Sequence, residues 1–597
     1  MYFITALVLS AALGSHGVSG LSRWGGECPW KGRTVQGTHP QHDVPDTGEI
    51  RYYDFTIARA TIAPDGVDRA SILVNGQFPG PLIEANWGDW VEVNIVNDIR
   101  DPEEPTSIHW HGFNMPGTPW FDGVPITSQC PLIPGHNLTY RFRADEYGTS
   151  WYHSHVSAQY TQGIVGPIVV HGPSDHVEYD EDLGPVLISD WYHGCFTDLL
   201  EKALGPSTQL DDIRPLADSN LLAGAGRYPC TDITDGTPCT DNVPYKRWDV
   251  EAGKTYRMRF VNTGSSSFFT VSLDSHAFTV MAVDFVPVEP HQVDKLVLSV
   301  GQRIDVIFTA SADSTQSYWL RASNSEICSD TQADSDALAI IAYPNAPAET
   351  APQSVGIAHP ANPVCDTGDI SLLHPVYSMP VQAPDLTLSL HLNAVFFPAG
   401  HLRYVINNQT FDSSNLYGQP LLHSVLDGVT TFPPENHVYS TYSARIVRLV
   451  LVSEFLPPHP MHLHGHDFQV LAQGVGEWDG TITNPINPLR RDVQAMHFGA
   501  NASDPNIGPN YVVLQYEADN PGVWPIHCHL AWHLAAGMVT SLIERADELQ
   551  AMKNDVPVEV LETCTLYNDW ARRQEGVWGE AGPGLEAVPA AASPKRR

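Results

Sequence analysis

The chain has 597 residues, and its 32 basic and 68 acidic side chains give a formal charge of 32 − 68 = −36 at pH 7. Nucleic acids and anionic membrane surfaces would repel this charge, so we expect neither as a partner. Apolar residues make up 42% of the chain, and a length of roughly 150 residues per domain predicts three to four domains. The 27 histidines are many, and the nine cysteines are an odd number, which indicates one thiol outside the disulfides.

The first twenty residues have the pattern of a secretory signal. An apolar run from Phe3 to Leu13 precedes the small residues Val18, Ser19 and Gly20, although no basic residue stands before Arg23. A buried strand or a membrane anchor is the alternative, but the run is well short of the ~20 apolar residues that cross a bilayer. Three Asn-x-Ser/Thr triplets, at residues 137, 408 and 501, agree with export. We therefore predict a secreted, extracellular glycoprotein.

The periodicity along the chain is that of β-strands. Apolar and polar residues alternate over 90–97 and 255–261, and short β-branched runs at 296–300 and 305–308 flank Gly301. Glycine and proline interrupt such runs at short intervals, as sandwich and barrel folds require. The clearest helical pattern is Ser541 to Met552. The sequence therefore predicts an all-β protein.

Two segments suggest repeated domains. Residues 140–143 follow Pro134-Gly135, and residues 256–260 follow Ala252-Gly253, so each looks like a turn that leads into a similar strand. The stretch 344–363 is rich in Pro and Ala and is typical of a linker. We therefore expect a signal peptide at 1–20, β-sandwich domains at 21–175 and 176–350, and a linker, third domain and tail at 351–597.

The histidines gather in four short segments, and His-x-His pairs recur in them. Residues i and i+2 of a strand point to one face, which places two imidazoles side by side. One such pair is more often an ordinary core or surface pair, but four in one chain predict a polynuclear metal site. The four segments contain eleven of the 27 histidines: 109–111, 153–155, 459–466 and 527–533.

The last of these segments also contains a cysteine between two histidines. Cys528 must face away from His527 and His529, so a thiolate lies on one side of the strand and two imidazoles on the other. Cysteine, two histidines and an axial methionine form the blue-copper set, and His459, His533 and Met538 are available to complete it. Zinc also takes Cys and His, but it performs no redox chemistry and has no use for eight further histidines.

With these four segments the sequence closely resembles the three-domain multicopper oxidases, especially fungal laccases. The matching motifs are His-Trp-His-Gly at 109–112, Trp-Tyr-His-Ser-His at 151–155, His-Pro-Met-His-Leu-His-Gly-His at 459–466, and His-Cys-His with Trp-His and Gly-Met at 527–538. The resemblance covers nearly the whole mature chain. It implies three consecutive cupredoxin-like Greek-key β-sandwich or barrel domains and four copper ions.

The resemblance also implies a role for each ligand. The type 1 copper would be held by His459, Cys528 and His533, with Met538 axial, and the type 2 copper by His109 and His462. One type 3 copper would be held by His111, His153 and His529, and the other by His155, His464 and His527. His466 is left over, and we expect it to support the ligands rather than to bind copper.

Other residues would serve catalysis or depart from the family pattern. Asp122 matches a carboxylate that delivers protons near the type 2 copper, although an Asp-Gly pair is also a common turn. Asp218 lies in a stretch like the one that lines the phenol pocket in laccases, and an ordinary loop Asp is the equal alternative. Ala531 stands where family members often have a second acidic residue. Met538 replaces the Leu or Phe of high-potential laccases, so we expect a low-to-moderate potential.

The resemblance predicts a laccase-like copper oxidoreductase, in which His533 faces a phenolic or aromatic substrate. One-electron oxidations of that substrate would be coupled through Cys528 to reduction of O2 to water. An ascorbate oxidase, a bilirubin oxidase or a ferroxidase of the same fold is the first alternative, and a copper-storage protein without turnover is the second. We expect a monomer.

The eight remaining cysteines are free to form disulfides. The resemblance suggests Cys130–Cys564, between the first domain and the C-terminal segment, and Cys328–Cys365. A bond between Cys230 and Cys239 would close a local loop and leave Cys28 with Cys195, but the sequence alone permits many other pairings.

Overall fold

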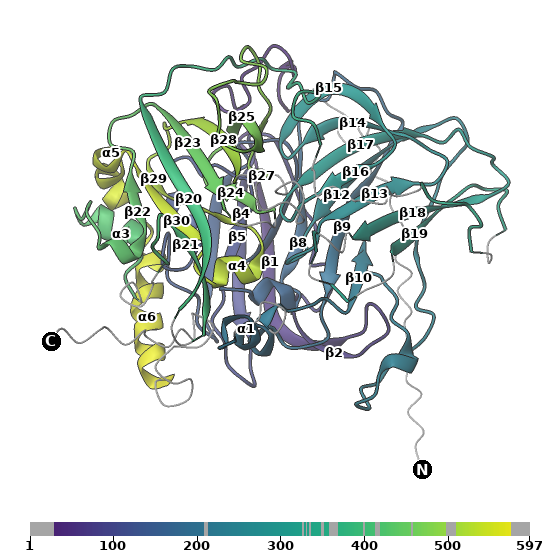
Figure 1. The fold of residues 1–597 in the computed structure, drawn as a ribbon, viewed down its shortest axis with the longest axis horizontal. Coiled ribbons are helices and arrows are strands. Elements are labelled where there is room, and N and C mark those ends of the chain that lie inside the picture. Colours follow the sequence, from purple (N-terminus) through teal and green to yellow (C-terminus); the bar gives the residue numbers. More distant parts are fainter. Residues whose placement is uncertain are drawn as a thin grey trace.

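The computed structural model describes residues 29–574 except 208–212, 325–327, 330, 333–335, 348–350, 358–367, 398–399, 412–417, 455–457 and 497–508. The predicted signal peptide, Cys28, Cys365 and Asn501 lie outside the described residues. The described chain is built mainly of strands in six sheets, which confirms the predicted all-β class. Consecutive parts of the chain each contribute two sheets (Figure 1).

The first pair of sheets is formed by β1 to β8. One sheet has the order β2-β1-β4-β6 and the other β3-β8-β7-β5. The strands are β1 (Ile50–Ile62), β2 (Arg69–Val74), β3 (Ile83–Asn86), β4 (Trp90–Asp98), β5 (Ile108–Trp110), β6 (Asn137–Arg143), β7 (Gly148–Ser154) and β8 (Val165–His171).

The second pair of sheets is formed by β9 to β19, on the right of Figure 1. Its orders are β10-β9-β12-β17-β14-β15 and β11-β19-β18-β13-β16. The strands are β9 (Glu181–Trp191), β10 (Ser219–Leu222), β11 (Lys246–Asp249), β12 (Thr255–Asn262), β13 (Phe269–Leu273), β14 (Phe278–Val283), β15 (Val286–Val293), β16 (Leu296–Leu298), β17 (Arg303–Thr309), β18 (Ser317–Asn324) and β19 (Ala337–Ala342).

The third pair of sheets is formed by β20 to β30, on the left of Figure 1. Its orders are β21-β20-β23-β28-β25-β26 and β22-β30-β29-β24-β27. The strands are β20 (Leu386–Phe396), β21 (Leu402–Ile406), β22 (Val438–Ser440), β23 (Ile446–Ser453), β24 (Pro460–Leu463), β25 (Phe468–Val475), β26 (Arg490–Arg491), β27 (Val493–Ala495), β28 (Asn510–Glu517), β29 (Gly522–Cys528) and β30 (Val539–Glu544).

The same connectivity recurs in the three pairs. In the first sheet of each, the strand that opens the unit lies parallel to a later one: β1 to β4, β9 to β12, and β20 to β23. That later strand then pairs antiparallel with β6, β17 or β28. The predicted equivalence of 140–143 and 256–260 is therefore wrong in detail, because β6 corresponds to β17 and β12 corresponds to β4. The predicted boundaries near 175 and 350 fall between the pairs and stay a proposal.

The strands follow the predicted periodicity. Along β4, residues at alternate positions are buried from Val91 to Asn97, because one face of the strand packs on the core. The predicted strand segments 90–97, 255–261 and 305–308 lie in β4, β12 and β17, while β16 covers only Leu296–Leu298 of the predicted strand 296–300. The predicted helix over 541–552 begins too early, because Ser541 to Glu544 belong to β30, a central strand whose buried residues pair with β29.

Five α-helices are described: α1 (Phe196–Leu204), α3 (Leu421–Leu426), α4 (Ala531–Ala535), α5 (Ala546–Ala551) and α6 (Val558–Gln574). None of the helices within the described part of the chain is long and apolar enough to cross a membrane. Helix α6 lies at the outer side of the third unit, close to the C-terminal end (Figure 1).

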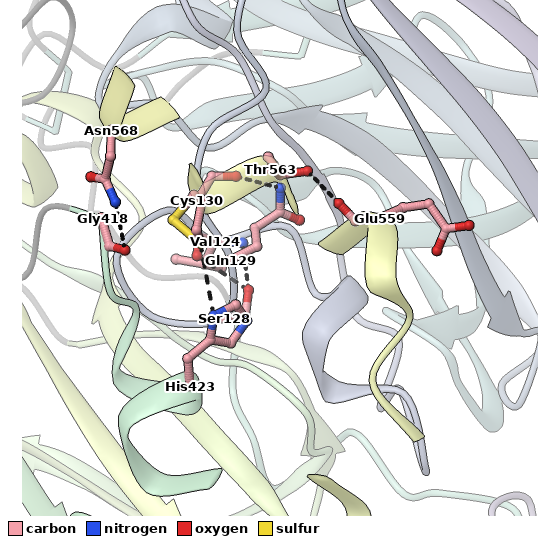
Figure 2. The surroundings of a disulfide bond; sticks show 10 residues. Val124, Ser128, Gln129, Cys130, Gly418, His423, Glu559, Thr563 and Asn568 are labelled. Carbon is pink, nitrogen blue, oxygen red and sulfur yellow. Dashed lines mark hydrogen bonds between the residues drawn. A yellow bond between two sulfur atoms is a disulfide. The ribbon is translucent and has the colours of Figure 1, made fainter. Parts of the chain in front are cut away.

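A disulfide joins α6 to the first unit, as predicted. Cys564 on α6 bonds with Cys130, 434 residues earlier, and Tyr567 and Trp570 pack beside the bond with Val156. Figure 2 shows this junction, where Asn568 Nδ2 also donates to Gly418 O at 3.2 Å. The helix is thereby fixed beside Val156, which directly follows His155.

The remaining predicted disulfides are confirmed only in part. Cys230 and Cys239 form the predicted local disulfide, and Cys328 is disulfide-bonded, while its predicted partner Cys365 lies outside the described residues. Cys195 has a free thiol at the start of α1, with its Sγ 3.2 Å from Thr197 Oγ1. The predicted pairing of Cys195 with Cys28 is therefore wrong in this structure.

Candidate metal centre

The strands of the first and third units bring the histidine pairs together. His109 on β5 lies opposite His153 on β7, and His462 on β24 lies opposite His527 on β29. The second histidine of each His-x-His pair lies on the same face two residues later. All ten predicted histidine ligands are buried, none being more than 8% exposed.

Cys528 faces a separate site on the other side of β29. Its Sγ lies 3.7 Å from Nδ1 of His459 and 3.7 Å from Nδ1 of His533, and the two nitrogens are 3.2 Å apart. Met538 is fully buried, and its backbone N–H donates to His533 O at 3.0 Å. Two imidazoles and a sulfur thus converge on one point, as in a mononuclear copper site.

The remaining eight histidines form one cluster between the first and third units. His464 Nε2 lies 3.0 Å from His527 Nε2, and His111 Nδ1 lies 3.3 Å from His529 Nε2. The ligand atoms of three histidine triads lie within 4.8 Å of one another: His109 with His111 and His153, His109 with His462 and His464, and His155 with His464 and His527.

Main-chain carbonyls fix the tautomer of four of these histidines. Each ring donates its Nδ1–H to a carbonyl at 2.8–2.9 Å, which leaves Nε2 with a lone pair directed into the cluster. The pairs are His109 with Asp122 O, His153 with Ser154 O, His462 with Asp492 O and His527 with Cys528 O. Nε2 of His109, His153, His155 and His462 is buried without a hydrogen-bond partner, which fits metal ligation.

Burial keeps the ligands in the form that binds metal. It lowers the pKa of His459 to about 3 and that of His527 to about 4, so the imidazoles are neutral at physiological pH. Burial raises the pKa of the Cys528 thiol, and a cation at the site is what would stabilise the thiolate.

Comparison with known proteins agrees with this geometry. Multicopper oxidase sequence profiles match residues 56–175, 182–346 and 400–548. The chain belongs to the multicopper oxidase family. It is therefore a copper-dependent oxidoreductase that uses O2.

The relatives place this multicopper oxidase among the laccase-like members. It is 38% identical over 554 residues to oxidoreductase OpS5 of Beauveria bassiana, covering 90% of this chain and 88% of that protein. It is 33% identical over 538 residues to Laccase-2 of Botryotinia fuckeliana, covering 88% and 87%. The crystal structure of a laccase from Botrytis aclada superposes with a TM-score of 0.81 at 30% identity, over 93% of this chain and 100% of that one. This supports the laccase-like prediction over the other oxidases and over copper storage.

The carboxylate of Asp122 touches two histidines of the oxidase's cluster. Its Oδ1 lies 3.1 Å from His109 Nδ1 and its Oδ2 lies 3.0 Å from His464 Nδ1. The turn is set by Gly123, which has φ = 82° and where a Cβ would lie 1.8 Å from Ile108 O. The Asp-Gly pair is thus a turn, as the alternative held, and it also directs a buried carboxylate at two ligands.

Asp492 is a buried residue near the cluster that the sequence did not signal. Its Oδ1 lies 3.0 Å from His111 Nε2, and Arg303 Nη1 donates to the same oxygen at 2.6 Å. His111 therefore presents Nδ1 to the cluster rather than Nε2. In the sequence, Asp492 stands out only as part of the charged run Arg490, Arg491 and Asp492. The structure shows that all three are buried, which is rare for consecutive charged residues.

Asp218 and His533 are not brought together by a hydrogen bond or ion pair in the part of the chain that the structure describes. The carboxylate of Asp218 accepts the backbone N–H of His193 at 2.7 Å, and His193 Nε2 lies 2.8 Å from Asp65 Oδ2. The ring of Tyr404 packs against His533 at 4.2 Å between centroids, and no motif in the sequence marks this tyrosine.

His466 points away from the cluster. Its Nδ1 lies 3.2 Å from His464 O, and its Nε2 lies 3.2 Å from a buried carboxylate oxygen of Glu544. The neighbouring Glu544 raises the pKa of His466, which favours a protonated imidazole over a metal ligand.

Proposed function

We propose that the protein is a secreted laccase-like oxidase that holds four copper ions and oxidises phenolic or aromatic substrates. When bound, the copper ions would accept single electrons from the substrate and pass four of them to O2. The observation that carries the proposal is the position of Cys528, between two histidines of the cluster and in contact with His459 and His533. One short segment of backbone thus belongs to both sites.

The ligands of the mononuclear site would be His459, Cys528 and His533, with Met538 as the axial group. The type 2 site would use His109 and His462. The type 3 sites would use His111, His153 and His529 on one side and His155, His464 and His527 on the other. Of the three triads of converging nitrogen atoms, His155 with His464 and His527 coincides with one site of this division.

Two carboxylates would orient histidines of the cluster, and one of them would also exchange protons there. Asp122 would hold His109 and His464 in place and accept or release protons beside them, because it is buried and lies within 3.1 Å of both rings. Asp492 would hold His111 so that Nδ1 faces the metal.

On the substrate side, His533 would present its outer edge to the phenol beside Tyr404. Asp218 would accept the phenolic proton, and its hydrogen bond from the backbone of His193 would hold the carboxylate in place. An Asp218→Asn variant should then slow phenol oxidation much more than ferrocyanide oxidation, and equal slowing of both would exclude the role.

Export and domain division complete the proposal. We place a signal peptide at residues 1–20 and domains at 21–175, 176–350 and 351–597, and we expect the mature protein to be a monomer. The side chains of Asn137 and Asn408 are exposed, as glycan attachment requires.

A substrate panel tests the proposed function. The copper-loaded enzyme should take up oxygen with a methoxyphenol at a higher kcat/KM than with ascorbate, bilirubin or Fe(II). A preference for Fe(II) or ascorbate would contradict the laccase-like proposal while leaving the oxidase family membership intact.

A further inference from the structure

A cavity of about 480 Å³ lies where the N-terminal segment meets the first and third units. Its lining includes Gln41 from the N-terminal segment, Asn114 and Asp145 from the first unit, and Asp467 and Arg490 from the third. Gly465 and His466 also line it, and they directly follow the predicted ligand His464. The cavity therefore reaches the chain segment that forms one wall of the metal centre.

Three carboxyl groups lie at or beside this cavity: Asp145 and Asp467 line it, and Glu146 directly follows Asp145 in the chain. Asp145 is 3% exposed and Glu146 is 1% exposed. Asn114 Nδ2 donates to Glu146 Oε1 at 2.8 Å, and Gln41 Nε2 lies 3.4 Å from Asp467 Oδ2. One oxygen each of Asp145 and Asp467 is buried without a hydrogen-bond partner. We call these three residues the carboxyl cluster.

The charges around the carboxyl cluster do not neutralise it. The charge of Arg490 interacts with both Asp467 and Glu146, but its Nη2 donates to Tyr377 O at 2.9 Å and its Nη1 has no hydrogen-bond partner. Asp492 and Asp284 add negative charge on the inner side of Asp467, and Arg303 adds positive charge. The other ionisable groups that face the cluster or line the cavity are Arg143, Tyr147, His39, His42, Tyr377, Arg445, His466, Tyr516, Glu517 and Asp519.

Burial and mutual repulsion therefore favour the protonated form of these carboxyls. Burial raises the pKa of Asp145 to about 7 and that of Asp467 to about 7, and repulsion from Asp492 adds to the effect on Asp467. Burial, then Asp467 and Asp145, raise the pKa of Glu146 well above its ordinary value. Such groups hold a proton at working pH and can release it.

The chemistry of the enzyme requires a proton source of this kind. Reduction of one O2 to two waters consumes four electrons, which four phenol molecules supply by one-electron oxidation, and four protons. In the described structure, Asp122 is enclosed by the cluster and fully buried, so protons have to reach the centre from elsewhere.

We propose that the carboxyl cluster of Asp145, Glu146 and Asp467 is the proton store of the oxygen-reducing centre, filled from solvent through the 480 Å³ cavity. In each step a carboxyl O–H bond breaks and the proton moves inward past Asp467, on the side where Asp492 contacts His111. Water in the cavity then returns a proton to the carboxylate. The proposal rests on the oxygen-reducing activity of the family and extends it to residues outside the copper ligands.

The test uses Glu146→Gln and Asp467→Asn in the copper-loaded enzyme. Both changes remove an ionisable group while they keep side-chain size and the hydrogen bonds from Asn114 and Gln41. Glu517→Gln is the matched control, because Glu517 lines the same cavity but pairs with Arg445 Nε at 2.8 Å. Copper content and the blue absorption should match the parent in all three variants.

Two measurements decide the proposal. After full reduction and mixing with O2, reoxidation should slow by about tenfold or more in both test variants, as expected for loss of a proton donor. Their solvent deuterium isotope effect should increase, while anaerobic reduction by phenol stays within about twofold of the parent. In the resting parent enzyme, infrared spectra should show protonated carboxyl groups at pH 6 that diminish by pH 9, and each test variant should lack part of this band.

Reoxidation at the rate of Glu517→Gln would overturn the proposal, and so would an infrared band that neither test variant changes. If a variant does not fold, the parent spectrum still decides: absence of protonated carboxyls at pH 6 excludes a proton store. Failure of oxygen uptake in the parent would instead contradict the proposed function, so the two failures are distinguishable.

Discussion

Asp122 Oδ2 lies 3.0 Å from Nδ1 of His464, and the same carboxylate reaches His109 through its other oxygen. The side chain is completely buried. A carboxylate in this position orients two predicted ligands and is close enough to exchange protons with groups bound beside them.

Replacement of Asp122 by Asn should therefore slow the oxygen-reducing half of the reaction. We expect reoxidation of the reduced enzyme to fall by about 100-fold, in the range typical of a lost general acid or base. The rate at which substrate reduces the blue site should be unchanged, since this step takes place at the mononuclear site and not at the cluster beside Asp122. Stopped-flow measurement of the two half-reactions checks this, and equal slowing of both would point to a merely structural role.

Replacement of Cys528 by Ser should separate the two copper sites. Cys528 is the residue of β29 that supplies a thiolate to the mononuclear site. Without this thiolate the blue absorption should vanish and phenol oxidation should fall below detection. The eight-histidine cluster does not involve this thiol, so we expect about three copper ions per chain to remain. Metal analysis with electron paramagnetic resonance measures this directly. Retention of the blue band would exclude Cys528 as its source.

The axial residue should control the potential of the mononuclear site. Met538 is fully buried next to His533, and a thioether stabilises oxidised copper. Met538→Leu should therefore raise the reduction potential, and each rise of about 60 mV corresponds to a tenfold change in the one-electron equilibrium constant. A redox titration of the blue band gives the value. An unchanged potential would show that Met538 does not bind the copper.

The long-range disulfide should stabilise the folded protein more than the local one. Cys130–Cys564 closes a span of 434 residues, whereas Cys230–Cys239 closes a span of nine. Removing the first with a Cys130→Ser, Cys564→Ser double variant should cost about 2–4 kcal/mol and lower the thermal midpoint by several degrees. The matched double variant at 230 and 239 should cost less, and the reverse order would contradict this account of α6.

The carboxyl cluster should make stability depend on pH. Asp145 and Asp467 have folded pKa values of about 7, above the ordinary value of 3.8, so the folded state binds more protons between these limits. The contribution of these two carboxyl groups to the free energy of unfolding is fully present at low pH and is lost as the pH rises through 7. Relative to Asp467→Asn, the parent should lose on the order of 1 kcal/mol of stability per pH unit between pH 4.5 and 6.5. Thermal midpoints across this range, with Glu517→Gln as control, measure the slope, and identical slopes would refute buried protonated carboxyls.

The sequence predicted those parts of the site that depend on local geometry. Alternation along a strand places His527 and His529 on one face and Cys528 on the other, and this does not depend on the rest of the fold. The partner sheets decide the remainder: Asp492 contacts His111 across 381 residues, and Tyr404 reaches His533 from β21. No local pattern marks such contacts, so they could not be read from one sequence.

The same distinction explains the errors in the fold. The pattern over 541–552 is helical, but long-range pairing with β29 makes Ser541 to Glu544 part of a strand. The apparent repeat of 140–143 and 256–260 rested on similar residues, but strand position depends on long-range pairing: β6 lies at a sheet edge and β12 lies inside its sheet.

Oxygen uptake with a phenol in the fully copper-loaded protein tests the central claim most directly. The account predicts one O2 consumed for four phenol molecules oxidised, with water rather than hydrogen peroxide as product, by a protein that holds four copper ions per chain and shows the blue band. Fully loaded protein that shows the band but consumes no oxygen with any phenol would contradict it.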